Sequence, residues 1–182
     1  LHGKHVGLIG FGGNGSALAK LLLPFGVRIS AYDPYLDDDA FFGGVTRAAT
    51  LDNFIGDVDV LSIHCPRTQE TENMVDAARF AQMKPNSYLI NCARGGIVDE
   101  TALVTALETG GIAAAGIDVF DVEAPPKDHP LWGLPNVLLS PHIAGVTRES
   151  FERMGTMAVE NAYKILNGEP IDPDCVVNPD AL

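Results

Sequence analysis

A glycine-rich segment near the start of the chain has the spacing of a phosphate-binding turn. Residues 10–15 read Gly-Phe-Gly-Gly-Asn-Gly, a G-x-G-x-x-G pattern between an apolar run and a helical stretch. Gly10 permits a tight turn, Gly12 lets a pyrophosphate approach the backbone, and Gly15 lets helix and strand pack closely. The N–H groups at the start of the helix favour an anion. Alone the pattern is weak, because glycines also mark ordinary turns.

Asp33 strengthens the prediction of a nucleotide site. It follows the second apolar run, about twenty residues after the first glycine, where a carboxylate can accept hydrogen bonds from ribose hydroxyls. A 2′-phosphate would meet its negative charge and those of the acidic segment 37–39. No Arg or Lys follows Asp33 until Arg47. These residues therefore predict NAD as the cofactor and disfavour NADP.

Three later segments place ionisable or polar side chains directly after apolar runs. They are residues 91–96 (Asn-Cys-Ala-Arg-Gly-Gly), 118–123 (Asp-Val-Phe-Asp-Val-Glu) and 140–145 (Ser-Pro-His-Ile-Ala-Gly). Ligands of open parallel sheets bind beyond the carboxyl ends of the strands, so the three segments are candidates for one site. Each side chain alone also has an ordinary explanation: a surface arginine in a turn, a solvated glutamate, or a structural histidine.

Short apolar runs alternate with helical stretches along the chain. This pattern predicts a doubly wound, Rossmann-type α/β fold, with about seven parallel strands and helices on both faces. Six strands can be located: Val6–Ile9, Val27–Tyr32, Asp59–Ile63, Ser87–Asn91, Ala113–Val119 and Val137–Ser140. The expected helices are Ser16–Leu23, Asp76–Met83, Glu100–Glu108 and Arg148–Leu166. The Pro-rich piece Ala124–Pro135 is expected to be a long ordered loop.

Composition bounds the class of protein. The chain has 182 residues, 46% of them hydrophobic and 20% charged, as expected for a globular domain. A net charge of −12 argues against binding to nucleic acid. No apolar stretch approaches the roughly 20 residues of a membrane span. The three cysteines (Cys65, Cys92 and Cys175) are odd in number and scattered, which favours a reducing cytoplasm.

The sequence from Gly3 to Pro179 resembles the D-2-hydroxyacid dehydrogenase family. The most specific matches are residues 91–100, the Asp-His-Pro-Leu-Trp of residues 128–132, and residues 140–145. The resemblance implies hydride transfer between NAD and a small 2-hydroxy or 2-oxo acid, such as a hydroxypyruvate or phosphoglycerate type of substrate. It also implies a homodimer formed through this domain. The loop Ala124–Trp132, with its prolines and Trp132, is the expected contact.

The same resemblance assigns roles to three catalytic residues. Arg94 corresponds to the arginine that holds the substrate carboxylate, a task suited to a planar guanidinium. His142 corresponds to the acid–base histidine, and Glu123 to the glutamate that orients it and favours its imidazolium form. Asp118 corresponds to the residue that holds the nicotinamide carboxamide. The full set of expected cofactor-binding residues is Gly10, Gly12, Gly13, Asn14, Gly15, Asp33, Cys65, Pro66, Cys92, Ala93, Asp118 and Gly145.

The chain also departs from the family pattern. Gly13-Asn14 stands where family members usually have Arg-Ile, which removes one side-chain contact to the pyrophosphate. Ala124 stands where a proline is common, which affects loop rigidity more than chemistry. Family members carry a second, substrate-binding domain built mainly from their N-terminal third. We therefore expect residues 1–182 to be the NAD-binding domain, with the substrate domain absent from this chain.

The same residues admit other interpretations. A formate dehydrogenase shares the fold but carries Gln at the position of Glu123, and a methyltransferase leaves the catalytic residues unexplained. An NAD(H)-sensing transcriptional corepressor of the same fold keeps all three catalytic residues, so they cannot separate it from an enzyme. No metal site is expected, because His5, His64 and His129 lack metal-ligand spacing. Cys92 is expected to pack near the cofactor, since no base precedes it at useful spacing.

Overall fold

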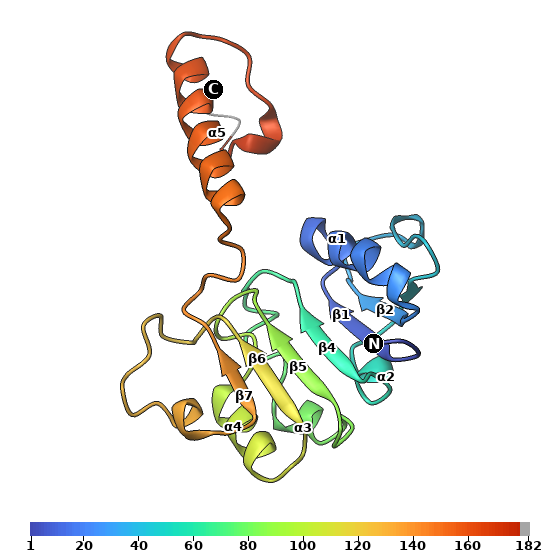
Figure 1. Ribbon diagram of the computed structural model, residues 1–182. Helices are drawn as coiled ribbons and strands as arrows, with labels where there is room; N and C mark the ends of the chain where they lie inside the picture. The colour runs from blue at the N-terminus through green and yellow to red at the C-terminus, as the bar shows by residue number, and fades with distance from the viewer. Residues whose placement is uncertain (179–182) are drawn as a thin grey trace. The chain divides into compact units, whose positions relative to one another are not determined.

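The computed structural model describes residues 1–178, which leaves Pro179, the last residue of the family resemblance, outside the described residues. One parallel sheet organises the fold (Figure 1). Its strands are β1 His5–Ile9, β2 Arg28–Tyr32, β3 Thr46–Arg47, β4 Val60–Ile63, β5 Tyr88–Asn91, β6 Ala114–Ile117 and β7 Val137–Leu139. They lie in the order β3-β2-β1-β4-β5-β6-β7, and every pairing is parallel. The order reverses between β1 and β4, which confirms the expected Rossmann-type topology.

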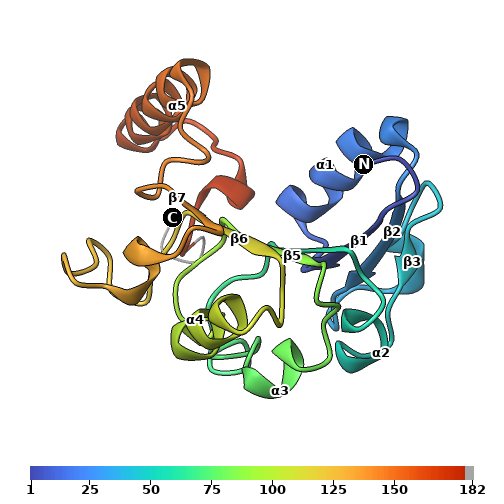
Figure 2. The same cartoon turned by 60° about the horizontal axis from the view of Figure 1, so that its bottom comes forward.

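Helices lie on both faces of this sheet, as Figure 2 shows: α1 covers one face, and α2, α3 and α4 lie on the other. The α-helices are α1 Gly13–Leu22, α2 Asp52–Ile55, α3 Ala77–Phe80, α4 Glu100–Glu108 and α5 Arg148–Leu166. Short 3₁₀ turns span Leu23–Phe25, Asp38–Ala40, Pro130–Gly133 and Pro173–Cys175.

The observed elements differ from the expected ones in a few places. Strand β3 was not located from the sequence, because its two residues are exposed and carry no apolar run. Helix α2 was also missed, since four residues are too few to show a helical period. Helix α1 begins three residues earlier than expected, at Gly13, and α3 is one turn shorter than its pattern. The Pro-rich loop holds a 3₁₀ turn at Pro130–Gly133.

Two apolar clusters, one on each face of the sheet, form the core. Val6, Leu8 and Ala19 belong to the cluster beneath α1. Ile9 and Phe54 belong to the larger cluster, which includes residues of α2, α3 and α4. Alternate residues of a strand point to opposite faces, so β1 contributes to both clusters. The sheet is therefore held rigid from both sides, and its carboxyl edge is a fixed platform.

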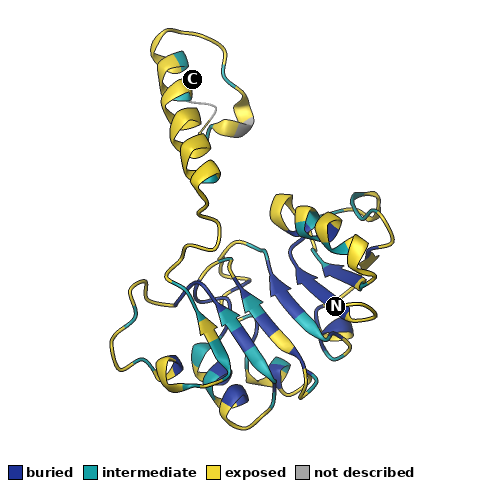
Figure 3. Ribbon diagram, viewed as in Figure 1, coloured by how far each residue is buried: buried dark blue, intermediate teal, exposed yellow. Residues whose placement is uncertain are grey.

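The described chain divides into two compact units, residues 1–142 and the residues from Ile143 onward. The second unit contains α5, whose start is fixed by a reciprocal cap between Thr147 and Ser150. The residues of α5 are largely exposed (Figure 3), and they include the apolar side chains of Phe151 and Val159. Within residues 1–178, no helix combines the length and the apolar character that a membrane span requires.

Candidate active site

The glycine-rich turn joins β1 to α1 and leaves room for a ligand. Gly10 has φ +91°, and a Cβ there would lie 2.7 Å from the backbone nitrogen of Cys65. A Cβ at Gly15 would lie 2.2 Å from the carbonyl oxygen of Gly10, so helix and strand touch closely there. Gly12 and Gly13 differ: a Cβ at either meets no described atom within 4 Å. Internal packing therefore requires the first and last glycines, whereas the middle pair border open space at the start of α1.

Asp33 lies at the end of β2 and faces the same turn. Its two carboxylate oxygens accept N–H groups from Phe11 at 2.9 Å and from Tyr35 at 3.1 Å. It lines a cavity of about 590 Å³ together with Gly10, Gly12, His64, Cys65 and Pro66. This volume is within the range of small-molecule sites. The turn, the helix start and the carboxylate provide the parts that a dinucleotide needs: an anion-binding backbone and a ribose acceptor.

Several residues of this cavity were not singled out from the sequence. The Tyr35 hydroxyl donates to a carboxylate oxygen of Glu70, and this hydrogen bond raises the pKa of Tyr35. Thr71 shapes the loop after β4, because its hydroxyl donates to the carbonyl of Pro66 at 2.7 Å. The signal that could have found them is their position just after β2 and β4, the two strands beside β1.

The acidic segment 37–39 is partly neutralised, since Asp38 pairs with Arg47 at 2.5 Å.

The cysteines near the carboxyl edge are poor nucleophiles. Burial raises the pKa of the Cys65 thiol to about 11. Burial also raises the pKa of Cys92, and the charge of Asp118 adds to this effect. Since the thiolate is the reactive form, neither residue is suited to covalent catalysis. Burial has the opposite effect on the neighbouring histidine: it lowers the pKa of His64, because the charged form of a histidine is the protonated one.

Arg94 lies in the turn after β5, and a buried asparagine builds that turn. The Asn91 side chain accepts the N–H of Ala93 at 3.1 Å and donates to the carbonyl of Arg94 at 3.1 Å. Asn91 is only 2% exposed, so the turn is anchored in the core. The guanidinium of Arg94 is exposed and donates to the carbonyl of Ala93. The backbone is thus fixed while the charged group remains accessible to a ligand.

Asp118 and Ser140 connect the ends of β6 and β7. Asp118 is 3% exposed, and its Oδ1 accepts the hydroxyl of Ser140 at 2.5 Å. Its carbonyl accepts the N–H of His142 at 2.8 Å. His142 has φ 54°, a left-handed conformation that is uncommon for a residue with a side chain. Such strain, held by a buried anchor, is typical of functional positions.

Glu123 and His142 form a hydrogen-bonded pair. Oε1 of Glu123 lies 2.9 Å from Nδ1 of His142, and their side chains are 59% and 43% exposed. A carboxylate accepts the Nδ1 proton, which leaves Nε2 as the nitrogen available to a ligand. The structure thus brings together two of the three residues to which the resemblance assigns catalysis. Since β5, β6 and β7 are neighbours, Arg94 lies at the same edge of the sheet.

The expected site residues of the first unit all lie beyond the carboxyl ends of six strands, β1, β2, β4, β5, β6 and β7. Of those after β1, β2 and β4, the residues Gly10, Gly12, Asp33, Cys65 and Pro66 line the cavity, whereas Gly13, Asn14 and Gly15 do not. The others follow β5, β6 and β7, which are neighbours in the sheet (Figure 1). Asn14 is exposed in the first turn of α1. Gly145 belongs to the second unit, where its carbonyl accepts the hydroxyl of Ser150 at 2.8 Å. The fold and these residues define a dinucleotide-binding α/β domain with a hydrogen-bonded Glu–His pair at its carboxyl edge.

Comparison with known proteins assigns the family. Residues 1–144 match the family model described as D-isomer specific 2-hydroxyacid dehydrogenase, NAD binding domain. The chain belongs to this family, which confirms the resemblance found in the sequence and the expected cofactor, NAD. The doubly wound fold and the glycine-rich turn agree with that description.

Relatives extend the match over almost the whole chain. A glyoxylate reductase of Thermofilum pendens is 42% identical over 184 residues, covering 100% of this chain and 53% of the relative. A D-3-phosphoglycerate dehydrogenase of Methanocaldococcus jannaschii is 40% identical, covering 93% of this chain and 32% of the relative. The structure of a D-lactate dehydrogenase with NAD⁺ from Lactobacillus jensenii has a TM-score of 0.85 at 36% identity, covering 92% of this chain and 54% of that one. The chain therefore spans about half or less of the length of these proteins.

Proposed function

We propose that the protein catalyses hydride transfer between NAD(H) and a small 2-hydroxy or 2-oxo acid. The observation that carries this proposal is the Glu123–His142 pair, with its 2.9 Å contact, at the edge of the sheet that also holds Arg94. The names of the relatives refer to glyoxylate, phosphoglycerate and lactate. Each of these compounds carries a carboxylate on the carbon that would be oxidised or reduced. Charge complementarity with Arg94 favours the same class of substrate here.

Arg94 would bind and orient the substrate. A guanidinium offers two parallel N–H donors that match a carboxylate, so one contact fixes both position and direction. Asn91 supports this role, because it holds the backbone of the Arg94 turn while the side chain remains exposed. A substrate clamped in this way presents its second carbon to the neighbouring loops after β6 and β7.

His142 would move the proton. In reduction of a 2-oxo acid, the imidazolium of His142 gives its Nε2 proton to the carbonyl oxygen as that oxygen gains charge. In oxidation, neutral Nε2 takes the hydroxyl proton. Glu123 holds Nδ1 at 2.9 Å, which fixes the ring orientation and stabilises the imidazolium by its negative charge. The pair thus performs both directions with the same atoms.

The residues fit the dinucleotide that this chemistry requires. When bound, the nicotinamide supplies the hydride acceptor or donor, which no side chain can replace. The pyrophosphate would be held mainly by backbone N–H groups of Gly12, Gly13 and Asn14 at the start of α1. Gly10 and Gly15 would shape the turn that presents these groups. Asp33 would accept ribose hydroxyls, and its charge would exclude a 2′-phosphate. We assign the nicotinamide half to the loops beyond β4, β5 and β6, with the residues Cys65, Pro66, Cys92, Ala93 and Asp118. Gly145, in the second unit, stays a prediction of the family resemblance.

We further propose that the protein is a homodimer through this domain, in the cytoplasm. The candidate contact is the loop Ala124–Trp132, in which Trp132 is 48% exposed although its indole N–H is fixed on the carbonyl of Pro126. A rigid, half-exposed aromatic residue suits an interface. The three free thiols suit a reducing compartment. Light scattering of the full-length protein at micromolar concentration should give the dimer mass; a monomer would contradict the assembly.

The experiment that tests the function is a panel of 2-oxo acids with NADH and the full-length protein. Oxidation of NADH that depends on one of these acids is expected, and Arg94→Ala should abolish most of it. If NADH binds but no acid is reduced, the protein is better explained as an NAD(H) sensor of the same fold. Oxidation of formate with NAD⁺, without reduction of 2-oxo acids, would favour the formate dehydrogenase interpretation that Glu123 opposes.

A further inference from the structure

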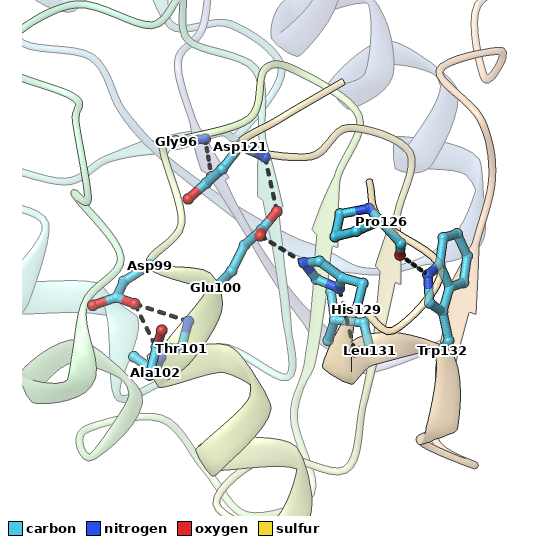
Figure 4. Close-up of polar contacts among 10 residues, drawn as sticks. All are labelled: Gly96, Asp99, Glu100, Thr101, Ala102, Asp121, Pro126, His129, Leu131 and Trp132. Carbon is cyan, nitrogen blue, oxygen red and sulfur yellow. Dashed lines mark hydrogen bonds and ion pairs between the residues drawn. The ribbon is translucent and has the colours of Figure 1, made fainter. Parts of the chain in front are cut away.

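A connected group of polar contacts lies beside the loops that carry Arg94 and Glu123 (Figure 4). Glu100, in the first turn of α4, uses both carboxylate oxygens. Its Oε1 accepts the backbone N–H of Asp121 at 2.8 Å, and its Oε2 lies 3.0 Å from Nε2 of His129. The Glu100 and His129 side chains are only 19% and 12% exposed. The resemblance in the sequence includes both residues but gives neither a role.

A second link joins the loop after β6 to the loop after β5. Oδ1 of Asp121 accepts the N–H of Gly96 at 2.6 Å (Figure 4). The backbones also touch, because a Cβ at Gly95 would lie 1.8 Å from the carbonyl oxygen of Phe120. The carboxyl of Asp121 has a raised pKa because of its burial and the nearby charge of Glu100. The loop after β5, which carries Arg94, and the loop after β6, which carries Glu123, are therefore joined directly.

A third link fixes the ring of His129. Its Nδ1 accepts the N–H of Leu131 at 3.3 Å, so the ring proton lies on Nε2 and points at Glu100. The ring also packs edge-on against Phe120, at 5.6 Å between centroids. Glu100 thus connects the Pro-rich loop, the Glu123 loop and the start of α4.

The contacts of Glu100 and Asp121 support the loop after β6, which carries Glu123. Glu123 and Ala124 are both exposed, and Ala124 has φ 57°, a conformation that costs energy for a residue with a side chain. Asp121, which precedes Glu123 by two residues, is held through its backbone N–H by Glu100 and through its side chain by Gly96. The position of Glu123 relative to His142 is therefore set by these contacts more than by packing around Glu123 itself.

We propose that Glu100 and His129 are positioning residues, which hold Glu123 and Arg94 in place for the reaction through Asp121 and Gly96. This inference rests on the proposed function. Displacement of a reacting group by about 1 Å can cost on the order of a hundredfold in rate. Neither residue lines the cavity beside Asp33. Loss of the Glu100–His129 contact should therefore impair turnover more than binding in that cavity.

Two substitutions of His129 separate this role from simple capping. Asn can place its carbonyl where Nδ1 lies, so His129→Asn keeps the acceptor for Leu131 but does not reach Glu100. Gln extends to the position of Nε2, so His129→Gln keeps the donor to Glu100 but loses the cap. In the full-length protein, His129→Asn should lower kcat/KM for the 2-oxo acid about 10- to 100-fold, and His129→Gln should recover most of it. The reverse order would show that His129 only caps the 3₁₀ turn, which would overturn the proposal.

Glu100→Gln tests the partner residue with almost no change in shape. The amide can still accept from Asp121, but its NH₂ then meets the Nε2 proton of His129. We expect a raised KM for the oxo acid, a basic limb of the pH–rate profile moved to lower pH, and an NADH Kd within about twofold of the original. The control is Asp99→Ala, which removes the cap on Thr101 and Ala102 at the start of α4 (Figure 4). If Asp99→Ala gives the same kinetics at the same loss of Tm, the effect is only helix fraying and the proposal fails.

Hydrogen exchange of the backbone distinguishes failure of this proposal from failure of the proposed function. Glu100→Gln and His129→Asn should speed exchange in peptides that cover residues 94–97 and 119–124, and His129→Gln should not. An active wild type with unchanged exchange and kinetics in all variants refutes the positioning role alone. A wild type that reduces no 2-oxo acid refutes the proposed function and the positioning role together, whatever the exchange shows.

Discussion

Substitution of Asp33 by Ala should weaken NAD binding and reduce the preference of the protein for NAD over NADP. The two oxygens of Asp33 each accept one backbone N–H, from Phe11 at 2.9 Å and Tyr35 at 3.1 Å. Each carboxylate oxygen has a second acceptor site, which remains for the ribose. A hydrogen bond to a charged group contributes about 1.5–3 kcal/mol, and Asp33 is only partly buried, so the lower part of that range applies. NAD affinity should therefore fall about 10- to 30-fold.

The effect on NADP should have the opposite sign. A carboxylate and a phosphate about 4 Å apart repel by about 4 kcal/mol per pair of charges at an effective dielectric constant near 20, and solvent screens part of this. Removal of the charge should strengthen NADP binding about tenfold or more. Titration calorimetry on the full-length protein measures both constants, with Asp37→Ala as the control, since Asp37 is exposed and does not line the cavity.

One outcome would refute this reasoning. The N–H of Phe11 belongs to the glycine-rich turn, so loss of its acceptor can also distort that turn. If NAD and NADP weaken by the same factor in Asp33→Ala, the residue only shapes the turn and does not choose the nucleotide. A change as large in Asp37→Ala would show that general charge, rather than the position of Asp33, sets the preference.

Three further predictions concern turnover and stability. Arg94→Ala should chiefly raise KM, because the substrate carboxylate is present before and during the reaction, whereas His142→Ala should chiefly lower kcat, by about 10²–10⁴-fold; steady-state kinetics in which both change only KM would contradict this division. Glu123→Gln removes the charge that stabilises imidazolium, so the basic limb of the pH–rate profile for reduction should move to lower pH, and an unmoved limb would rule out Glu123 as the partner. Burial lowers the pKa of His5, so its neutral form stabilises the fold above the unfolded value of about 6.5, and this stability is lost as the pH falls below it. In thermal unfolding, lowering the pH from about 7 to about 5 should reduce the Tm of His5→Gln by less than it reduces the Tm of the wild type. The exposed control His2→Gln should show the same reduction in Tm as the wild type.

Local patterns in the sequence were sufficient to predict the sheet and the cofactor turn. Apolar runs locate six of the seven strands, and in a parallel sheet the residue after each run must lie at the carboxyl edge. Asp33 and Arg94 therefore follow from strand ends alone. The pairing of Glu123 with His142 was implied only by family resemblance, because 19 residues separate them along the chain.

Contacts that depend on how loops meet were beyond the reach of the sequence pattern. Glu100 is at an ordinary first-turn position of a helix, and its link to His129, 29 residues away, depends on the path of the Pro-rich loop. The same holds for the Tyr35–Glu70 hydrogen bond across the cavity. The positive φ of His142 is also invisible in the sequence, since nothing in the local residue types demands it. Each of these features is set by tertiary packing, which no periodicity reports.

The open backbone beside Gly12 and Gly13 has a consequence for how such a domain can change over generations. Main-chain N–H groups are present whatever side chains a gene encodes. A substitution at Gly12 or Gly13 can therefore fill the open space beside these groups, but it does not change their ability to donate to an anion. In the site proposed above, the choice of nucleotide is assigned elsewhere, to Asp33 and its neighbours on a separate loop after β2. On this assignment, single substitutions after β2 can change which dinucleotide is bound, and each variant along the way still binds the pyrophosphate through the backbone of the glycine-rich turn.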